Sequence, residues 1–455
     1  MMIGIRTRTL ACALLFASSS LAGCATIRTA PAPSNAQVTL EQAARGSNAF
    51  ALDLYREVAV EGDNLFFSPA SISLAMGFAY RGADGETAKQ LREVMHFPGG
   101  PTAYLPAAGA LDRLMDLSGE GRELRSANAF WVHDRLELVP EFEADLQREA
   151  SGSFRRVDFG ADPEAARTDI NRWVAGRTQH RIEELISKDV IRKKTAAVLV
   201  NALYWKADWL KPFYAEGTRS QPFFLADGNK IQAELMNSRE EFRGIEKGSV
   251  KLLELPYAGG EVSMVAILPD KSGGLARLEN SLTPRRLESW LEELDAAEPY
   301  DTMLTLPKLS LDWNGDLGGT IKAMGAPLPF SKQANFDRMA LFPQAALPDW
   351  CGLTVTNVIH RANIDVDEKG SEAAAATAVV MGVIVVSSSG GPPPPPPFVF
   401  RADHPFMFLL RDKRSGAILF MGRLVDPRQD HTNGPGPDLS PIPEVSPKDG
   451  CPAKL

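Results

Sequence analysis

Cysteine is scarce in this chain of 455 residues. The four cysteines stand at positions 12, 24, 351 and 451, which is too sparse for a disulfide-rich scaffold or a zinc site. An excess of basic residues is also missing, because 49 Lys and Arg face 57 Asp and Glu, a formal net charge of −8. A nucleic-acid-binding protein needs the opposite balance. We therefore expect neither nucleic acid nor a metal among the partners.

Familiar catalytic motifs are missing as well. The sequence has no Gly-x-Ser-x-Gly, His-Glu-x-x-His, phosphate loop or Cys-x-x-Cys pattern, and its six histidines lack the spacing of metal ligands. An enzyme of a familiar type is not expected. The chain does contain the material for a large core, since 44% of its residues are hydrophobic and 23% are charged, which is typical of a globular protein.

The N-terminus has the order of an export signal. Arg6 and Arg8 precede an apolar stretch at 10–17, which is too short to span a membrane permanently. The next residues, Leu-Ala-Gly-Cys at 21–24, resemble the bacterial lipoprotein box, in which the chain is cut before the Cys and the Cys is acylated. The resemblance implies a signal peptide at 1–23 and a lipid on Cys24. An ordinary signal peptide, cut at a nearby small residue, is the alternative.

These expectations place the protein outside the cytoplasm. We expect it to be exported and held by the lipid in the bacterial cell envelope, in the outer membrane, on its periplasmic or outer surface. Residues 24–38, rich in Ala, Thr, Pro and Ser, are typical of a flexible tether. The protein's own acidic surface would not hold it on anionic lipid, so the acyl chains would supply the attachment.

Helix and strand patterns alternate from Thr39 onward. Thr39 and Gln42 predict a capping box at the start of an amphipathic helix. Helical patterns also cover 71–80, 142–149 and 170–186. Strands are predicted at 196–204, 261–268, 303–306, 398–400, 406–410 and 418–425.

The stretch from 365 to 400 combines opposite tendencies. Four alanines favour a helix, whereas the Val- and Ile-rich run at 379–386 favours a strand. Serines, glycines and six consecutive prolines follow, and such residues cannot enter a central strand. A strand-forming segment between flexible and stiff linkers is what a mobile, insertable loop requires.

The sequence resembles the serpin family from about residue 40 to 427. The resembling segments occur in the family's order and are NLFFSPASIS at 64–73, GADGET at 82–87, LVNALYWK at 199–206, LPY at 255–257, LPK at 306–308, HR at 360–361, DEKGSEAAA at 367–375, HPF at 404–406 and FMGR at 420–423. The resemblance implies one α+β domain at 39–427 with three β-sheets, eight or nine helices and an exposed reactive-centre loop at about 368–400. Residues 428–455 form an added tail rich in Pro, Gly and Asp, which we expect to be a solvated extension.

The resemblance also implies a function. A serpin inhibits serine endopeptidases as a suicide substrate: the protease cuts the loop, forms an acyl-enzyme and is trapped when the cleaved loop inserts into the central sheet. The chemistry belongs to the protease's nucleophile and oxyanion hole, so no cofactor is needed. The alternative is a non-inhibitory serpin-fold binding or carrier protein whose loop is only cleaved.

The hinge at the start of the loop favours inhibition. Inhibitory serpins have small residues there, because bulky or charged side chains obstruct insertion. Gly370 removes a steric barrier to unusual backbone angles where the chain must swing. The hinge comprises Glu368, Gly370, Ser371, Glu372, Ala373, Ala374, Ala375 and Ala376.

The family's spacing from Glu368 places the scissile bond between Ile384 and Val385. The loop is longer than usual, so cleavage after Met381, Val383 or Val385 remains open. An aliphatic residue before the bond favours elastase-like or subtilisin-like proteases over trypsin-like ones, whose pocket would keep an unpaired acid.

Further residues match single positions of the family. A polar cluster beneath the central strands, called the shutter, is matched by Ser68, Ser71, Asn201 and His360. Trp209 matches the tryptophan at the site where the loop first enters, called the breach, although Trp205 is close by.

No basic cluster suited to heparin occurs, and a monomer is expected. Whether Cys351 and Cys451 form a disulfide is left open, because sequence does not show whether they approach each other.

Overall fold

The computed structural model describes residues 37–115, 117–119, 121–149, 154–341, 352–371 and 395–436. These residues belong to one compact unit, Asn35–Leu455. No helix in these segments is both long and apolar enough to cross a membrane.

Nine α-helices occur in the described segments. Thr39 begins α1 with the predicted capping box, since Gln42 N donates to Thr39 Oγ1 at 3.2 Å and Thr39 N donates to Gln42 Oε1 at 3.0 Å. The helices are α1 (Leu40–Val58), α2 (Pro69–Gly82), α3 (Gly85–Val94), α4 (Pro101–Leu114), α5 (Pro140–Glu149), α6 (Pro163–Arg177), α7 (Leu275–Ser281), α8 (Pro284–Ala296) and α9 (Gly318–Ala323).

One predicted helix is shorter than expected. The pattern at 170–186 predicts a helix to Ile186, but α6 ends at Arg177. Gln179 and His180 take positive φ values of 50° and 62°, and His180 N donates back to Ala175 O at 2.7 Å. The apolar residues after this reversal are buried, but their backbone is irregular. Their apolar spacing therefore looks helical in the sequence although no helix forms.

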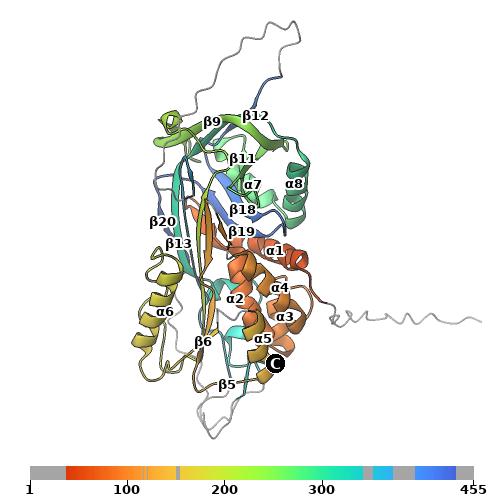
Figure 1. The fold of residues 1–455 in the computed structure, drawn as a ribbon, viewed down its shortest axis with the longest axis vertical. Helices are drawn as coiled ribbons and strands as arrows, with labels where there is room; N and C mark the ends of the chain where they lie inside the picture. The colour runs from red at the N-terminus through yellow and green to blue at the C-terminus, as the bar shows by residue number, and fades with distance from the viewer. Residues whose placement is uncertain are drawn as a thin grey trace, which may run out of the picture. The chain divides into compact units, whose positions relative to one another are not determined.

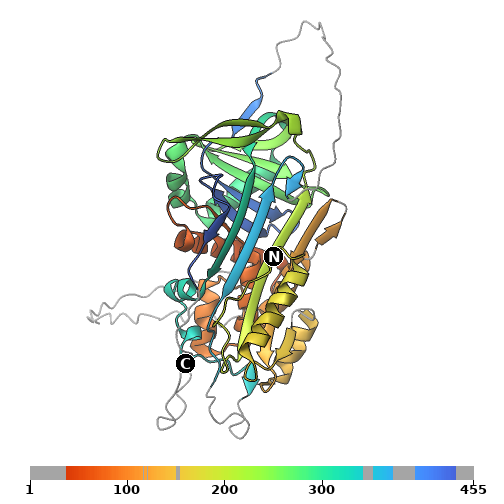
Figure 2. The same cartoon turned by 90° about the vertical axis from the view of Figure 1, so that its left-hand side faces the viewer.

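A large sheet runs through the centre of the unit. Its strand order is β2-β3-β7-β16-β15-β13-β20, and β4 pairs with β7 and β6. Figure 2 shows α6 lying across one face of this sheet, and Figure 1 shows α2 and α4 on the opposite side. The strands are β2 (Leu117–Gly119), β3 (Arg122–Ser126), β4 (Ala129–His133), β6 (Phe154–Val157), β7 (Ala197–Asp208), β13 (Leu309–Asp316), β15 (Ile359–Val366), β16 (Gly370–Ser371) and β20 (His431–Asn433).

Two further sheets share one long strand, β9. Its C-terminal part pairs with β10 and its earlier part with β8 and β12, so β9 passes from a second sheet, β1-β19-β18-β11-β10-β9, into a third, which β17 completes. The strands are β1 (Leu65–Phe67), β8 (Arg219–Phe224), β9 (Lys230–Glu246), β10 (Val250–Pro256), β11 (Val262–Pro269), β12 (Tyr300–Pro307), β17 (Phe398–Arg401), β18 (Phe406–Asp412) and β19 (Ile418–Leu424), with β5 (Glu137–Leu138) and β14 (Ala340–Leu341) as a separate pair. The prediction of an α+β fold with three sheets and eight or nine helices is confirmed.

Burial explains why the central strands sit where they do. β7 is buried along most of its length, as expected for a strand covered on both faces. On one face α6 packs through Ile170 and Val174 against a small cluster that includes Val200 and Ile359. On the other face the main core contains α2 and the second sheet.

The start of the added tail differs from expectation. Residues 428–455 were expected to be solvated, yet His431–Asn433 form β20, which pairs in parallel with β13 at the outer edge of the large sheet. The physical reason is that β13 offers an edge strand with hydrogen-bonding groups that an extended segment can satisfy.

Candidate functional site

The candidate site is the junction between β7 and β15. The two strands pair in parallel over five positions, from Ile359 opposite Val200 to Asn363 opposite Tyr204. Beyond these positions β16 lies between them, with Ser371 opposite both Ala207 and Val366. The sheet is therefore closed along one part of the junction and already holds two hinge residues in the other.

A tight turn returns the chain from β15 into β16. Asp367 Oδ1 accepts hydrogen bonds from Lys369 N at 2.8 Å and Gly370 N at 3.2 Å. Asp367 N donates to Gly370 O at 2.8 Å. These bonds stabilise the turn as an Asx-type turn.

Gly370 lies against the backbone of β7. A Cβ atom at this position would stand 2.0 Å from Ala207 O and 2.6 Å from Asp208 Cα. Gly370 is not among the residues with positive φ. In this structure glycine is therefore required for close approach to β7, whereas unusual backbone angles, the reason expected from sequence, are not used.

Glu368 ties the turn to its surroundings. Its Oε1 lies 2.8 Å from Lys308 Nζ and accepts from Thr218 Oγ1 at 2.6 Å, and its carbonyl oxygen accepts from Phe213 N at 2.8 Å. Partial burial opposes the charge of Glu368, but the hydrogen bonds from Lys308 and Thr218 outweigh it and hold the pKa of this carboxyl below its usual value. The carboxylate is ionised at neutral pH.

Trp209 covers the point where the hinge enters the sheet. Its indole Nε1 donates to Asp367 O at 3.0 Å, and its amide donates to Lys369 O at 2.7 Å. Its ring stacks on Tyr257 with a centroid distance of 4.4 Å and an interplanar angle of 12°. Trp205 meets the same Tyr257 ring edge-on at 5.1 Å, so only Trp209 bonds the hinge turn directly.

Tyr257 also contacts the hinge, which sequence reasoning missed. Its hydroxyl forms a hydrogen bond of 2.8 Å with Ser371 Oγ, and both side chains are buried. Burial raises the pKa of Tyr257, so the hydroxyl is neutral. The motif Leu-Pro-Tyr at 255–257 was noted only for its order in the chain, although a buried tyrosine needs a partner for its hydroxyl.

The structure brings together the four shutter residues. Ser68 is the N-cap of α2, where its Oγ accepts from Ser71 N at 3.2 Å and donates to Leu419 O at 2.6 Å. Asn201 Nδ2 donates to Ser71 Oγ at 2.5 Å. Asn201 stands directly opposite His360 across the β7–β15 pairing, and their side chains are hydrogen-bonded.

His360 is neutral in this arrangement. Its Nε2 accepts from Ser68 N at 3.0 Å and its Nδ1 faces Asn201 Oδ1, which fits an imidazole protonated at Nδ1. Complete burial lowers the pKa of His360 to about 3. A charged imidazolium would have no acceptor for a proton at Nε2, because that position faces a backbone amide.

Two further residues complete the shutter. Asn128 Oδ1 accepts from Ser71 Oγ at 2.6 Å and from Asn201 Nδ2 at 3.1 Å. Trp313 of β13 lies beside His360 with a ring centroid distance of 6.0 Å. No sequence signal marked Asn128, since it lies between two short strands, whereas buried polar residues in general need partners.

Several predicted residues lie outside the described residues. These are the lipid site Cys24, the hinge residues Glu372, Ala373, Ala374, Ala375 and Ala376, the reactive bond Ile384–Val385, and the cysteines Cys351 and Cys451. They stay predictions.

One group in the described segments could supply metal ligands, away from the hinge. Donor atoms of His133, Asp134 and Asp158 lie within 4.8 Å of one another. These donors are engaged within the protein, since His133 Nδ1 accepts from Arg135 N at 3.2 Å and Asp158 Oδ1 accepts from Gly160 N at 2.9 Å. The group contributes nothing to the β7–β15 junction.

The junction holds one short strand, β16, between β7 and β15. His360 and Tyr257 are held neutral by burial, whereas Glu368 is ionised and paired with Lys308. Along the junction β7 and β15 pair directly over five positions, and β16 separates them beyond these positions.

Comparisons with known proteins agree with this geometry. The model of the family "Serpin (serine protease inhibitor)" matches residues 45–427. The chain is 32% identical over 391 residues to an uncharacterized serpin-like protein of Methanosarcina acetivorans, covering 85% of this chain and 88% of that protein. It is 33% identical over 398 residues to the leukocyte elastase inhibitor of Bos taurus, covering 85% and 100%.

Solved structures show the same fold. Human thyroxine-binding globulin, in complex with thyroxine, matches with a TM-score of 0.72 and 26% identity, over 86% of this chain and all of that one. Family match, sequence identity and sheet architecture thus coincide over the same residues, and the chain belongs to the serpins, a family of serine protease inhibitors.

Proposed function

We propose that this protein inhibits serine endopeptidases as a suicide substrate. A protease cuts the reactive-centre loop. The nucleophile of the protease stays bonded, as an acyl-enzyme, to the new carboxyl end of the loop. The freed loop then inserts between β7 and β15 as a full strand and carries the protease with it. The observation that carries the proposal is β16, because its two loop residues, Gly370 and Ser371, already lie between β7 and β15, with Ser371 paired to both strands.

The number of hydrogen bonds broken and formed favours the inserted loop over the closed junction. Insertion breaks one short parallel ladder between β7 and β15 and allows two antiparallel ladders in its place. Each net intramolecular hydrogen bond stabilises by roughly 1 kcal/mol, and antiparallel pairing is slightly more stable per residue. Small side chains at 373–376 suit entry beside a packed core.

An elastase-like or subtilisin-like target follows from the loop. The bond at Ile384–Val385 would offer the protease an aliphatic side chain, which suits an apolar pocket and not one built around an acid. The identity to a leukocyte elastase inhibitor supports the same class of target.

One incubation tests the proposal. Purified protein is mixed with elastase or subtilisin and run on a denaturing gel, with active-site-blocked protease as the control. We expect a complex that survives SDS only with the active protease, and a released C-terminal peptide that starts at Val385. A cleaved loop together with fully active protease would refute trapping and favour the second candidate, a carrier, which the similarity to thyroxine-binding globulin supports.

We further propose that the protein is lipid-anchored in the cell envelope through Cys24. Support comes from the residue order at 6–24. Replacing Cys24 by Ser should abolish labelling with radioactive palmitate and release the protein from the membrane fraction. Cys12→Ser is the matched control, because Cys12 would leave with the signal peptide, and it should change neither readout.

A further inference from the structure

The outer edge of the large sheet is closed by the tail. β20 pairs with β13, with Thr432 opposite Trp313. Three more hydrogen bonds extend this contact: Asp312 N donates to Asp430 O at 2.8 Å, Gly434 N to Asn314 O at 2.7 Å, and Asp316 N to Pro435 O at 2.7 Å. Without these residues β13 would be an edge strand in the described part of the sheet. The tail begins beyond residue 427, where the family match ends.

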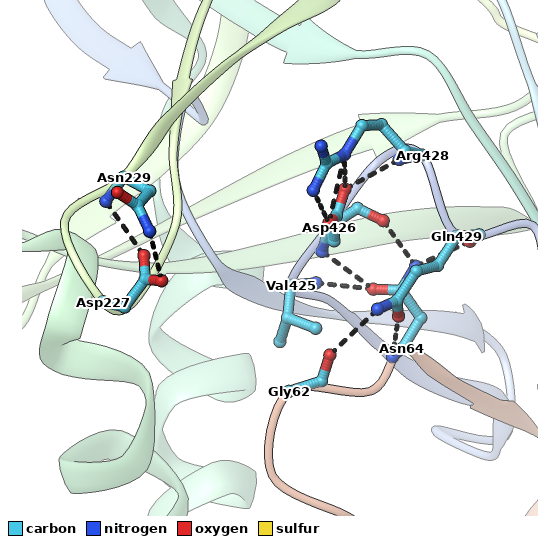
Figure 3. Close-up of polar contacts among 8 residues, drawn as sticks. All are labelled: Gly62, Asn64, Asp227, Asn229, Val425, Asp426, Arg428 and Gln429. Carbon is cyan, nitrogen blue, oxygen red and sulfur yellow. Dashed lines mark hydrogen bonds and ion pairs between the residues drawn. The ribbon is translucent and has the colours of Figure 1, made fainter.

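Asn64 fixes the point from which the tail departs. Asn64 is 2% exposed, and Figure 3 shows it facing the chain at 425–429. Its Oδ1 accepts from Val425 N at 2.7 Å and Asp426 N at 3.1 Å, and its Nδ2 donates to Asp426 O at 2.7 Å and Gln429 O at 2.8 Å. The side-chain amide of Asn64 thus makes four hydrogen bonds to the segment that leads into β20.

The neighbouring residues stiffen the same segment. Arg428 forms an ion pair with Asp426 at 2.6 Å, and Gln429 Nε2 donates to Gly62 O at 3.3 Å (Figure 3). Because the path is fixed before β20 begins, pairing with β13 loses less chain entropy than pairing with a free segment would.

Gly434 fits against Trp313. A Cβ atom on Gly434 would stand 2.2 Å from Trp313 Cζ2, so no side chain is tolerated there unless the tail moves. Trp313 itself is 2% exposed. Gly436, two residues later, has nothing within 4 Å of its Cβ position. The tail therefore has one position of tight fit, followed by an open one.

We propose that residues 430–435 are an intramolecular edge cap, which occupies a strand-accepting surface on β13 that would otherwise bind a strand from a second copy of this chain. An uncovered edge strand presents unpaired amide and carbonyl groups and is a template for pairing between molecules. The cap supplies in the same molecule, and in a fixed place, the strand that a second copy would supply. The proposal does not depend on protease inhibition.

Two variants and a matched control test the cap. One variant ends after Gln429, and the other is Gly434→Val in the full chain. The control is Gly436→Val, which makes the same chemical change where there is room. In size-exclusion chromatography with light scattering, we expect the full chain and Gly436→Val to be monomeric, whereas the two variants at least double in mass as concentration rises. Truncated protein that stays monomeric at every concentration at which the full chain was tested would overturn the proposal.

Hydrogen exchange and a peptide distinguish an open edge from misfolding. In the full chain the amides of Asp312 and Asp316 should be protected, and in the truncated chain, diluted until it is monomeric, they should exchange faster by about tenfold or more. A synthetic peptide of residues 429–436, added to the truncated chain, should restore both protection and the monomer. Equal exchange in the full chain and in the diluted, monomeric truncated chain, or a peptide without effect on the oligomers, would contradict the edge cap.

Discussion

At the residue scale the hinge depends on the close packing of Gly370 against the backbone of Ala207. The α-carbon of Gly370 packs so closely on Ala207 that even a methyl group would stand 2.0 Å from the carbonyl oxygen. Overpacking of this kind typically costs about 1–3 kcal/mol. The cost falls on β16, the part of the loop that is paired before any protease arrives.

Gly370→Ala should therefore convert the inhibitor toward a substrate. Slower insertion by about tenfold, the rate equivalent of about 1.4 kcal/mol, lets the acyl-enzyme hydrolyse before it is trapped. We expect more inhibitor molecules to be consumed per molecule of elastase inactivated, measured by titration of residual activity. Gly176→Ala is the control, since nothing lies within 4 Å of that Cβ position, and its titration should match the unaltered chain. An unchanged titration for Gly370→Ala would show that the close approach does not limit insertion.

His360 makes a second residue-scale prediction, on pH. Burial lowers the pKa of His360 from its ordinary value of 6.5 to about 3. The unfolded chain thus binds a proton below pH 6.5 that the native state binds only near pH 3, so stability is lost as pH falls through this window. Between pH 6.5 and 4.5 the loss from this group is about 2–3 kcal/mol. Chemical unfolding measures this loss in the unaltered chain and in His360→Gln. As pH falls, the free energy of unfolding should decline more steeply in the unaltered chain. Parallel declines would contradict a buried neutral imidazole.

At the element scale, three parts of the chain meet at Asn128. It lies between β3 and β4 and accepts hydrogen bonds from Ser71 of α2 and Asn201 of β7. Removing its amide leaves two buried donors without this acceptor, and each such loss typically costs about 1–3 kcal/mol. The cost applies to the closed junction, where these elements are held together.

Asn128→Ala should lower the thermal unfolding midpoint of the uncleaved protein by roughly 3–5 °C. Differential scanning fluorimetry measures the shift, and Asn280→Ala, at an exposed position of α7, is the control and should change the midpoint little. A midpoint equal to that of the control would mean that water or another group replaces the amide of Asn128.

The elements also show how far sequence carries the argument. The capping box at Thr39, the strands at the C-terminal end and the apolar run that became β7 could be predicted, because each depends on local pattern. Asn128 and Tyr257 could not, since their partners lie 57 or more residues away in sequence. β20 was missed because a three-residue strand leaves no periodicity, and its pairing depends on an edge elsewhere in the chain.

At the scale of the whole molecule, the proposed function requires two arrangements of the large sheet, and the closed junction is the one described. Among the described residues β7 and β15 pair directly over five positions, and β16 places two loop residues, Gly370 and Ser371, between them. A loop freed at one end could extend that pairing along the full length of β7, which has 12 residues. In the uncut chain both ends of the loop are held, by β16 on one side and β17 on the other, so insertion would require one end to detach.

Cutting the loop should therefore stabilise the molecule instead of loosening it. About ten added ladder bonds at roughly 1 kcal/mol each would raise the thermal midpoint by roughly 20 °C. Limited proteolysis in the loop by a protease that is not trapped, followed by a melting curve, measures this, with the uncut protein as the reference. Gly370→Ala, cut in the same way, should still gain stability once insertion is complete, because the substitution slows entry more than it weakens the final ladder. A cut chain that melts at or below the midpoint of the uncut one would mean that the loop does not insert, and the fold would then serve binding and not protease trapping.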